Sequence, residues 1–318
     1  MSTITTDIEL AKTYLKRGDI VAIPTETVYG LAGNAENEKA IHKIYTLKQR
    51  PLNHPLIMHV AQDWDLLKWV SFIPDYAQSL ISKFWPGPLT LVLKSNINAV
   101  NPLITGGQDT IALRCPKHPL AHRLLKDLGF PLVAPSANPF GKISPTTAEH
   151  VRDSFKEEDL LILDGGRCQV GIESTILAAT APYHYQILRH GMITEQEIAA
   201  ILPQRSMHEE SAIRVPGKLA SHYQPEKPLY CFTDLTALKA FYQQEKSVYV
   251  ITFGELQDHP SHLYYKMPDS VDKSAFELYY QLRRADQSEA TSIAIELPPA
   301  GEHWAGIRER ILKAGHRS

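Results

Sequence analysis

The strongest constraint on the fold is a change of pattern near residue 204, which divides the 318-residue chain into two unlike parts. Before it, short apolar runs typical of buried strands are mixed with amphipathic helical patterns and hairpin-length gaps. After residue 227, strand and helix patterns simply alternate. The stretch between is polar and broken by prolines. We therefore expect a first domain over 1–203, a linker over 204–227 that crosses the first domain's surface, and a smaller domain over 228–318.

The first part has the pattern of an α/β domain with a mixed sheet. Residues 7–16 are predicted to form a helix that Thr6 or Asp7 caps and Gly18 follows. Helices are also predicted over 38–47, 75–84, 120–128 and 147–154, with another starting near 194. Strands are predicted over 19–24, 89–94, 110–115, 131–135, 160–164, 174–178 and 185–189.

The second part has the pattern of three β-α units. Strands are predicted over 229–232, 248–253 and 293–297, and helices over 235–245, 274–287 and 305–314. Such alternation favours a small parallel, Rossmann-like sheet in a three-layer arrangement. The glycine-rich dinucleotide fingerprint is absent, so we expect no nucleotide in this domain.

Composition excludes several classes of protein. The net charge is −2, with −1 in each part, so a dedicated nucleic-acid binder is not expected. No apolar run reaches about 18 residues, and the first residues do not resemble a secretion signal, so no membrane span or export is expected. Three scattered cysteines without a CxxC pair argue against disulfides and zinc, and indicate a reducing, cytoplasmic setting.

Polar residues follow the first predicted strand in Pro24-Thr25-Glu26-Thr27-Val28-Tyr29-Gly30-Leu31. Hydroxyls and a carboxylate at the carboxyl end of a strand suit a polar ligand, because open α/β sheets bind ligands there. The alternative is a capping box, with Thr25 or Thr27 starting a helix.

Two cations, Lys48 and Arg50, close the second helical pattern. They either complement the negative end of the helix dipole or clamp phosphate through charge-assisted hydrogen bonds. His59 closes the apolar run that follows His54-Pro55, and is either a satisfied buried histidine or a ligand contact. Both alternatives stay open from the residues alone.

Further candidate groups lie at later strand ends. Alternation places Thr110, Ala112 and Arg114 on one face of a strand, where the arginine would hold a carboxylate or face solvent. A loop rich in hydroxyls, amide and proline runs from 134 to 146 and suits either binding or turn formation. Glycines at 165, 166 and 171, the 173–176 stretch, Arg189 and the 221–225 stretch of the linker complete the set.

Together and in this order, the motifs closely resemble those of the YrdC-type threonylcarbamoyl-AMP synthases, in their longer two-domain form. The resemblance is dense over about 20–200 and looser in the second domain, where it rests mainly on residues 305–312. It is carried by PTETVYGL at 24–31, KQRP at 48–51, HPLIMH at 54–59, WPGPLT at 85–90, TIALRCP at 110–116, APSAN at 134–138, SPT at 144–146, ESTI at 173–176 and SHYQP at 221–225.

The resemblance implies a curved YrdC-like sheet with a deep hollow, closed by the linker, and assigns residues to two substrates. Lys48 and Arg50 would meet the nucleotide phosphates and are the expected catalytic pair. The remaining ATP contacts would come from His54, Thr110, Ser136, Asn138, Ser144, Arg189 and Tyr223. L-threonine would be held by Thr27, His59, Arg114, Ala134 and Ser174. In the family, position 54 is often asparagine.

The implied reaction joins L-threonine, bicarbonate and ATP into threonylcarbamoyl-adenylate and pyrophosphate, the first step of a tRNA modification. It needs no covalent catalyst, only positioning and phosphate neutralisation, with Mg²⁺ expected to assist. Expected partners are these small molecules and downstream tRNA-modifying transfer proteins. The alternatives are an RNA-binding module of the same fold without ATP turnover, a carbamoyl transferase of hydrogenase maturation, and a non-catalytic sensor of ATP or threonine.

Overall fold

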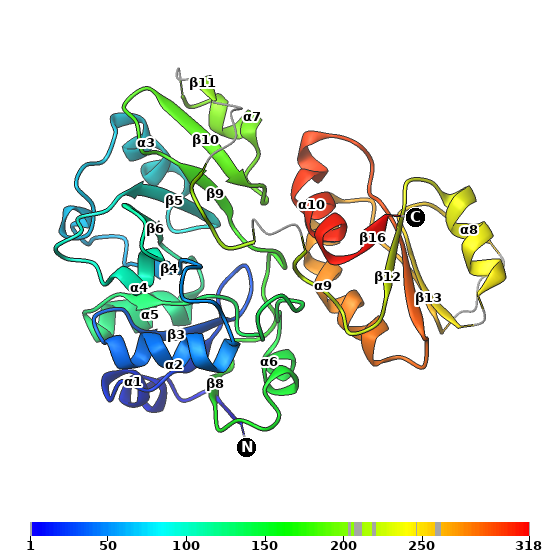
Figure 1. The fold of residues 1–318 in the computed structure, drawn as a ribbon, viewed down its shortest axis with the longest axis horizontal. Helices are drawn as coiled ribbons and strands as arrows, with labels where there is room; N and C mark the ends of the chain where they lie inside the picture. Colours follow the sequence, from blue (N-terminus) through cyan, green and yellow to red (C-terminus); the bar gives the residue numbers. More distant parts are fainter. Residues whose placement is uncertain are drawn as a thin grey trace.

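The computed structural model describes residues 2–202, 205–206, 212–217, 221–245, 247–257 and 262–317. Two sheets lie side by side, each with its own helices (Figure 1). The expected α/β architecture with a mixed-sheet first domain and a smaller second domain is confirmed. The expected linker is described at 205–206, 212–217 and 221–227, and its other residues lie outside the described part.

The sheet of the first domain has 11 strands among the described residues, in the order β1-β8-β2-β3-β7-β4-β6-β5-β9-β10-β11. Parallel and antiparallel pairs are mixed: β4 and β6 run parallel, whereas β5 and β6 run antiparallel. The strands are β1 Thr3–Thr5, β2 Val21–Ile23, β3 Gly30–Asn34, β4 Ile57–His59, β5 Leu89–Lys94, β6 Thr110–Arg114, β7 Leu132–Val133, β8 Leu161–Leu163, β9 Thr175–Ala178, β10 His184–Arg189 and β11 Arg205–Ser206.

The helices of this domain, except α3, begin at side-chain caps that the sequence supplies. The Asp7 carboxylate accepts from the backbone amides of Glu9 and Leu10, and Thr194 forms a capping box with Glu197. The helices are α1 Ile8–Lys16, α2 Glu38–Lys48, α3 Asp75–Phe84, α4 Pro102–Thr105, α5 Pro119–Leu128, α6 Ala148–Ser154 and α7 Glu195–Ala199, with a 3₁₀ turn at Leu66–Lys68.

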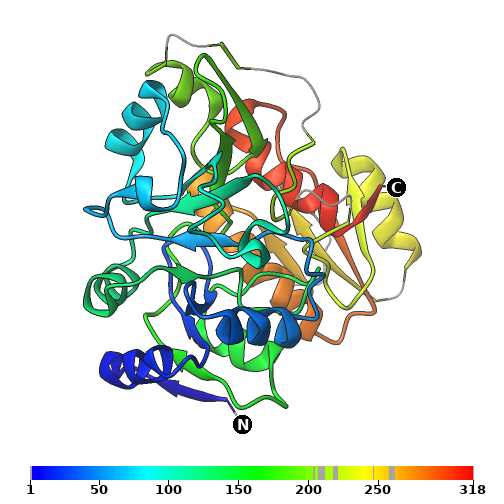
Figure 2. The same cartoon turned by 60° about the vertical axis from the view of Figure 1, so that its left-hand side comes forward.

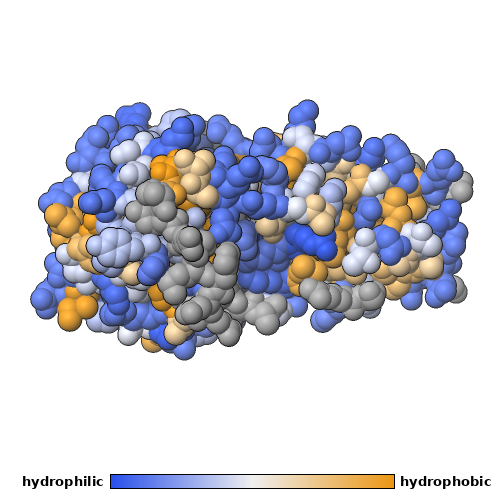
Figure 3. All heavy atoms as spheres, turned by 90° about the horizontal axis from the view of Figure 1, so that it is seen from above, coloured by the Kyte–Doolittle hydropathy of each residue, from blue (hydrophilic) through white to orange (hydrophobic). Residues whose placement is uncertain are grey.

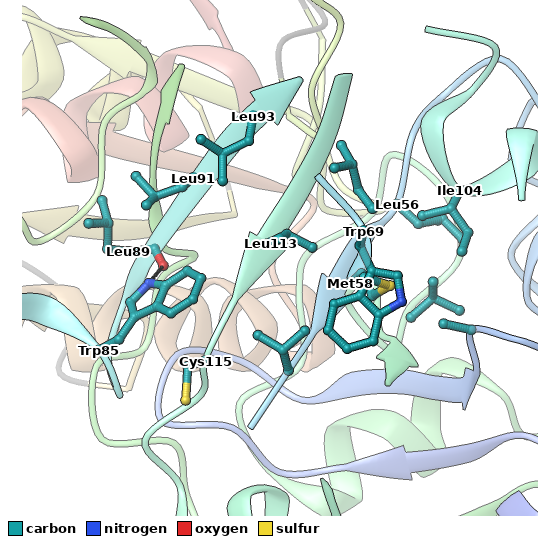
Figure 4. Packing of buried hydrophobic residues seen from close by; sticks show 14 of the residues in the cluster. Leu56, Met58, Trp69, Trp85, Leu89, Leu91, Leu93, Ile104, Leu113 and Cys115 are labelled. Atoms are coloured by element: carbon teal, nitrogen blue, oxygen red, sulfur yellow. Dashed lines mark hydrogen bonds between the residues drawn. The ribbon is translucent and has the colours of Figure 1, made fainter. Parts of the chain in front are cut away.

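Alternation along the central strands separates the core from the site. Leu89, Leu91 and Leu93 of β5 point into the same apolar cluster as Leu113 of β6 (Figure 4). The Trp85 indole at the start of this stretch donates a 2.8 Å hydrogen bond to Leu89 O. The opposite face of β6 therefore carries the residues of even number, including Arg114.

The second sheet is parallel throughout, in the order β14-β13-β15-β12-β16. Helices α9 and α10 cover the face toward the first domain, and α8 covers the far face, which makes the expected three layers (Figures 1 and 2). The elements are β12 Leu229–Phe232, α8 Leu235–Gln244, β13 Val248–Thr252, β14 Tyr264–Lys266, α9 Val271–Gln287, β15 Ser292–Glu296, α10 Ala305–Ala314 and β16 His316–Arg317, with a 3₁₀ turn at Glu302–Trp304. The sequence pattern predicted neither β14 nor β16.

The two domains share one hydrophobic cluster. Val28, Ile143 and Ile172 of the first domain pack with side chains from α9, α10 and the second sheet, and Tyr223 of the linker joins them. Gly171 approaches α9 so closely that a Cβ would lie 2.4 Å from Ala275 O. From above, the surface is mostly hydrophilic with small scattered apolar groups (Figure 3). Among the described residues, no helix is long and apolar enough to span a bilayer.

One alternative from the sequence is wrong. No helix begins at Thr25 or Thr27, because the chain turns there and enters β3 at Gly30. The Thr25 hydroxyl stabilises this turn: its oxygen accepts from the amides of Thr27 and Val28 and donates to Val28 O. The hydroxyls therefore serve a tight turn between two antiparallel strands rather than a helix cap.

Candidate active site

A cavity lies where strand ends of the first sheet, the end of α2 and the linker meet. Residues from all of the sequence motifs between 24 and 225 except two reach it. Its lining consists of Thr27, Val28, Lys48, Arg50, Ile57, His59, Arg114, Ala134, Pro135, Ser136, Asn138, Phe140, Gly141, Glu173, Arg189, Pro216, Gly217, His222 and Tyr223. The two exceptions are the 85–90 and 144–146 stretches.

Lys48 is the last residue of α2 and is only 1% exposed. Its ammonium donates to Ser136 O and Asn138 O, both at 2.5 Å, which ties the helix to the 134–141 loop. Burial, with a smaller effect from the charge of Arg50, lowers the pKa of Lys48 well below its usual value. A bound anion would stabilise the charged ammonium and raise the pKa of Lys48 again.

Arg50 follows a left-handed Gln49 that ends α2. Its guanidinium donates to Pro55 O at 2.8 Å and His54 O at 3.2 Å, and its Cζ lies 5.2 Å from the centre of the Phe140 ring. Burial lowers its pKa to about 10, so it stays charged at neutral pH. These contacts hold a cation in the cavity wall without neutralising it.

His59 and Arg114 are direct neighbours, because β4 and β6 pair in parallel with these residues in register. Neither ring nitrogen of His59 has a hydrogen-bond partner, although both are buried. Burial, followed by the charge of Arg114, lowers the pKa of His59 to about 3, so the ring is neutral. A neutral, unpartnered imidazole in a cavity wall is available to a ligand.

Arg189 ends β10 and is 3% exposed. It donates to Ser174 O from Nε at 3.1 Å and Nη2 at 2.9 Å, and to Pro216 O from Nη1 at 3.1 Å. The hydroxyl of Ser174 also accepts from Arg189 and lies 2.7 Å from the hydroxyl of Thr90. This arginine therefore joins the strand ends to the linker.

The linker closes one side of the cavity. Tyr223 adopts a left-handed backbone (φ 64°) and is 1% exposed, and the His222 ring lies against it with centroids 4.2 Å apart. Burial raises the pKa of Tyr223 to about 12 and lowers that of His222 to about 3, so both side chains are neutral. They add polar groups without charge to a cationic wall.

The cavity brings together most of the residues predicted for the site. Those that line it are Thr27, Lys48, Arg50, His59, Arg114, Ala134, Ser136, Asn138, Arg189 and Tyr223. Four predicted residues do not line it. Ser144 and Ser174 hydrogen-bond residues that do, His54 packs edge-on to Phe140, and Thr110 begins β6 on the face that carries Arg114.

Sequence reasoning assigned no role to Glu173, Phe140, Pro216, Gly217 or His222. Glu173 belongs to the 173–176 motif, and His222 is next to Tyr223 in the 221–225 motif. Their positions in these motifs could therefore have identified both as candidate site residues. Phe140 carried no signal, since one aromatic residue in a loop is compatible with many roles.

The lining offers little to a protein-bound metal. Glu173 is the sole carboxylate among the described residues that line the cavity. Its oxygens accept from Ser144, Tyr279 and Arg310. Across the described ranges, no group of three or more His, Cys, Asp or Glu side chains is placed to hold an ion.

Comparisons with known proteins cover the whole chain. A family model described as "Telomere recombination" matches residues 13–191, and one described as "Threonylcarbamoyl-AMP synthase, C-terminal domain" matches residues 193–315. Two similar relatives are both called threonylcarbamoyl-AMP synthase. That of Bacillus subtilis is 35% identical over 99% of this chain and 94% of its own length, and that of Pyrococcus abyssi is 35% identical over 98% and 94%.

A solved structure is similar to this chain over nearly its whole length. The crystal structure of P. abyssi Sua5 complexed with L-threonine superimposes with a TM-score of 0.88 at 32% identity, covering 99% of this chain and 97% of that one. A doubly substituted variant of the same protein gives a TM-score of 0.86 at 30% identity, covering 100% of this chain and 98% of that one.

Proposed function

The chain belongs to the threonylcarbamoyl-AMP synthase family, in its two-domain form, and we propose that the cavity described above joins L-threonine, bicarbonate and ATP. The protein is an enzyme that makes an adenylate intermediate. The finer assignment of substrates to residues is part of this proposal, and the charges and unpartnered groups in the cavity support it.

A single observation supports the nucleotide site most strongly. Lys48, Arg50 and Arg189 are all at least nine-tenths buried and line one cavity. Within the described part of the chain, none of the three forms a salt bridge with a carboxylate. Buried cations without counter-ions are costly unless a ligand supplies the negative charge. A polyphosphate supplies it, so these residues bind the phosphates of ATP.

The adenosine end of ATP lies along the 134–141 loop and the linker. Ser136, Asn138 and Tyr223 belong to the cavity lining. The Tyr223 hydroxyl is buried and has no hydrogen-bond partner, and the same holds for Asn138 Oδ1. His54 and Ser144 act through their contacts with the lining residues Phe140 and Glu173, and Thr110 acts from the start of β6. Unpartnered polar atoms in a cavity wall are groups that a ligand can satisfy.

L-threonine binds around the His59–Arg114 pair. Thr27, His59, Arg114 and Ala134 belong to the cavity lining, and Ser174 contacts the lining residue Arg189. The guanidinium of Arg114 faces the substrate carboxylate, and the neutral ring of His59 accepts or donates to the substrate hydroxyl. Thr27 is fully buried and shares a 2.9 Å hydroxyl contact with Thr25, which fixes its side chain.

The reaction proceeds by positioning and charge neutralisation. The threonine nitrogen attacks the bicarbonate-derived carbon, and water is lost as the carbamate forms. A carbamate oxygen then attacks the α-phosphorus, the bond to the bridging oxygen breaks, and pyrophosphate leaves. Lys48 and Arg50 stabilise the charge that develops on the phosphates. Because Glu173 is already held by three donors, Mg²⁺ would enter with the nucleotide as part of the substrate.

The product is a mixed anhydride that water destroys, so the reaction benefits from a closed site. Pro216, Gly217, His222 and Tyr223 cover the cavity from the linker. The linker therefore acts as a lid that must open for release. The product is then passed to proteins that transfer the threonylcarbamoyl group to tRNA. The three cysteines are buried and, within the described structure, form no disulfide, which suits this work in the reducing cytoplasm.

Product formation tests the proposal. The purified chain is incubated with ATP, Mg²⁺, L-threonine and bicarbonate, and threonylcarbamoyl-adenylate is measured by mass spectrometry together with pyrophosphate. We expect both products only when threonine and bicarbonate are present, and L-serine serves as the matched substrate control. Pyrophosphate release that ignores threonine, or tight tRNA binding without product, would contradict the proposal.

A further inference from the structure

The second domain contributes a side chain that contacts a residue of the cavity lining. Arg310 of α10 is completely buried and reaches across to the first domain. Its Nε lies 3.1 Å from Glu173 Oε2, and its Nη2 lies 3.3 Å from Glu173 O. Its Nη1 donates to His190 O and, at 3.3 Å, to Gly306 O. One guanidinium thus holds both the side chain and the backbone of a cavity residue.

The Glu173 carboxylate is fixed from three sides. Besides Arg310, the Ser144 hydroxyl donates to Oε1 at 2.5 Å and the Tyr279 hydroxyl of α9 donates to Oε2 at 2.9 Å. Two of these three donors come from the second domain. Glu173 directly precedes Ser174, whose carbonyl accepts twice from Arg189, so any shift of Glu173 moves the adjoining contacts.

The ion pair between Arg310 and Glu173 also affects the electrostatics of the cavity. Glu173 lines the same cavity as Lys48, Arg50 and Arg189. An uncompensated carboxylate there would compete with phosphate for these cations, and would repel the polyphosphate in a poorly screened setting. Arg310 supplies the opposite charge from behind the wall. The cations in front therefore remain free for the nucleotide.

The same helix also holds the linker. Lys313 donates to Gly217 O at 2.6 Å, and its own carbonyl accepts from the His222 amide at 2.9 Å. The Arg310 guanidinium lies 5.6 Å from the centre of the Tyr223 ring. One turn of α10 thus contacts both the carboxylate in the wall and the lid above it.

We propose that Arg310 is a positioning residue of the active site, which keeps Glu173 neutralised and oriented so that Lys48, Arg50 and Arg189 are available to ATP. The second domain is then part of the catalytic apparatus rather than an appended module. The inference rests on the proposed function, since it assumes that ATP occupies the cavity.

Steady-state kinetics of four proteins test this role: the parent, Arg310→Met, Glu173→Gln/Arg310→Met and the control Arg308→Met. Arg308 is on the same helix, but its guanidinium donates to Pro298 O within the second domain. We expect Arg310→Met to lower kcat/KM for ATP by at least about 30-fold, mainly through KM, and Arg308→Met to change it less than about twofold. We expect kcat/KM for ATP of Glu173→Gln/Arg310→Met to be at least about fivefold higher than that of Arg310→Met, because the double variant has no unpaired carboxylate at position 173.

The outcomes separate the two proposals. A parent that forms no product overturns the proposed function. A parent that is active while Arg310→Met matches Arg308→Met overturns only the role of Arg310. A double variant no more active than Arg310→Met overturns the charge argument. Circular dichroism shows whether Arg310→Met folds. If it does not, the role of Arg310 is tested with Glu173→Gln/Arg310→Met and with Arg310→Lys. A raised KM for ATP in both of these variants, with measurable product, supports the positioning role, and KM values equal to the parent's contradict it.

Discussion

Arg114 Nη2 lies 2.7 Å from Glu26 Oε1, and both side chains are at most 5% exposed. The other carboxylate oxygen, Oε2, accepts from the Lys117 amide at 3.0 Å, while Arg114 Nε donates to Gly87 O at 3.3 Å. The arginine assigned to the substrate carboxylate is therefore already held by an acid from the 24–31 turn. We infer that Glu26 fixes the direction of the guanidinium before threonine arrives.

Replacing Glu26 by glutamine tests this relationship. The variant leaves Arg114 buried without its counter-ion, and we expect the free energy of unfolding to fall by about 3 kcal/mol, as for other broken buried pairs. We also expect KM for threonine to rise at least about tenfold, since the guanidinium is no longer fixed. Urea denaturation and steady-state kinetics measure the two effects.

The matched control is Asp109→Asn, which breaks the exposed pair with Lys94 (2.6 Å). An exposed pair contributes at most about 1 kcal/mol, so little change is expected in either measurement. Equal effects of the two substitutions would show that burial of the Glu26–Arg114 pair has no special consequence.

The phosphate contacts are tested by Lys48→Ala and Arg50→Ala. Each removes a buried cation from the cavity, and we expect kcat/KM for ATP to fall at least about tenfold, equivalent to about 1.4 kcal/mol of lost stabilisation. Lys43→Ala is the control, because Lys43 is on the same helix but pairs with Asp19 outside the cavity at 2.7 Å. If Lys43→Ala were as damaging as either variant, loss of helix stability rather than of phosphate contacts would explain the result.

Three buried histidines predict a loss of stability in mild acid. Burial lowers the pKa of His59, His150 and His222 to about 3, whereas an unfolded histidine titrates near 6.5. Between these values the unfolded chain binds more protons, so stability is fully present above about pH 6.5 and falls as the pH decreases toward 3. At about pH 5.5 the loss is roughly 1 kcal/mol per histidine. Urea denaturation at about pH 7.5 and 5.5 measures it.

The single variant His150→Gln isolates one contribution. His150 Nδ1 accepts from the Thr146 amide, and a glutamine oxygen can take that role without titrating. We expect this variant to lose less stability between the two pH values than the parent does. An unchanged pH dependence would mean that His150 is not among the groups responsible.

The close approach of the two domains predicts a strong effect of Gly171→Ala. Both Gly171 (φ +88°) and Gly166 (φ +77°) have left-handed backbones, so an alanine at either costs about 1 kcal/mol in strain. At Gly171 the new Cβ would also meet Ala275 O and Phe276 Cα of α9, whereas at Gly166 nothing lies within 4 Å. We expect Gly171→Ala to destabilise the protein by at least about 2 kcal/mol more than Gly166→Ala does, as urea denaturation would measure.

Local patterns predicted the main elements well. The expected bounds of α3, β5, β12 and α10 match the structure, and those of most other long elements differ by a residue or two. These elements bury one regular face, so their periodicity is visible in the sequence. The strands β1, β14 and β16 have two or three residues each, which is too short for a periodic signal.

The sequence predicted residues of the cavity lining where they belong to local motifs, and it missed contacts between residues that are distant in the chain. Alternation placed Arg114 on the correct face of its strand, but its partner Glu26 is 88 residues away. Glu173 and Arg310 are separated by 137 residues and lie in different domains. Nothing in either local sequence indicates such a pairing, because it depends on how the two sheets pack.

The hydrophobic cluster shared by the domains limits how far the enzyme can be trimmed. Val28 belongs to the turn that lines the cavity, yet it packs among side chains supplied mostly by the second domain. A fragment ending near residue 203 would expose Val28, Ile143 and Ile172 to water, together with an uncompensated Glu173. A minimal catalytic unit cut from this chain would therefore need polar replacements at those positions before it could stay monomeric.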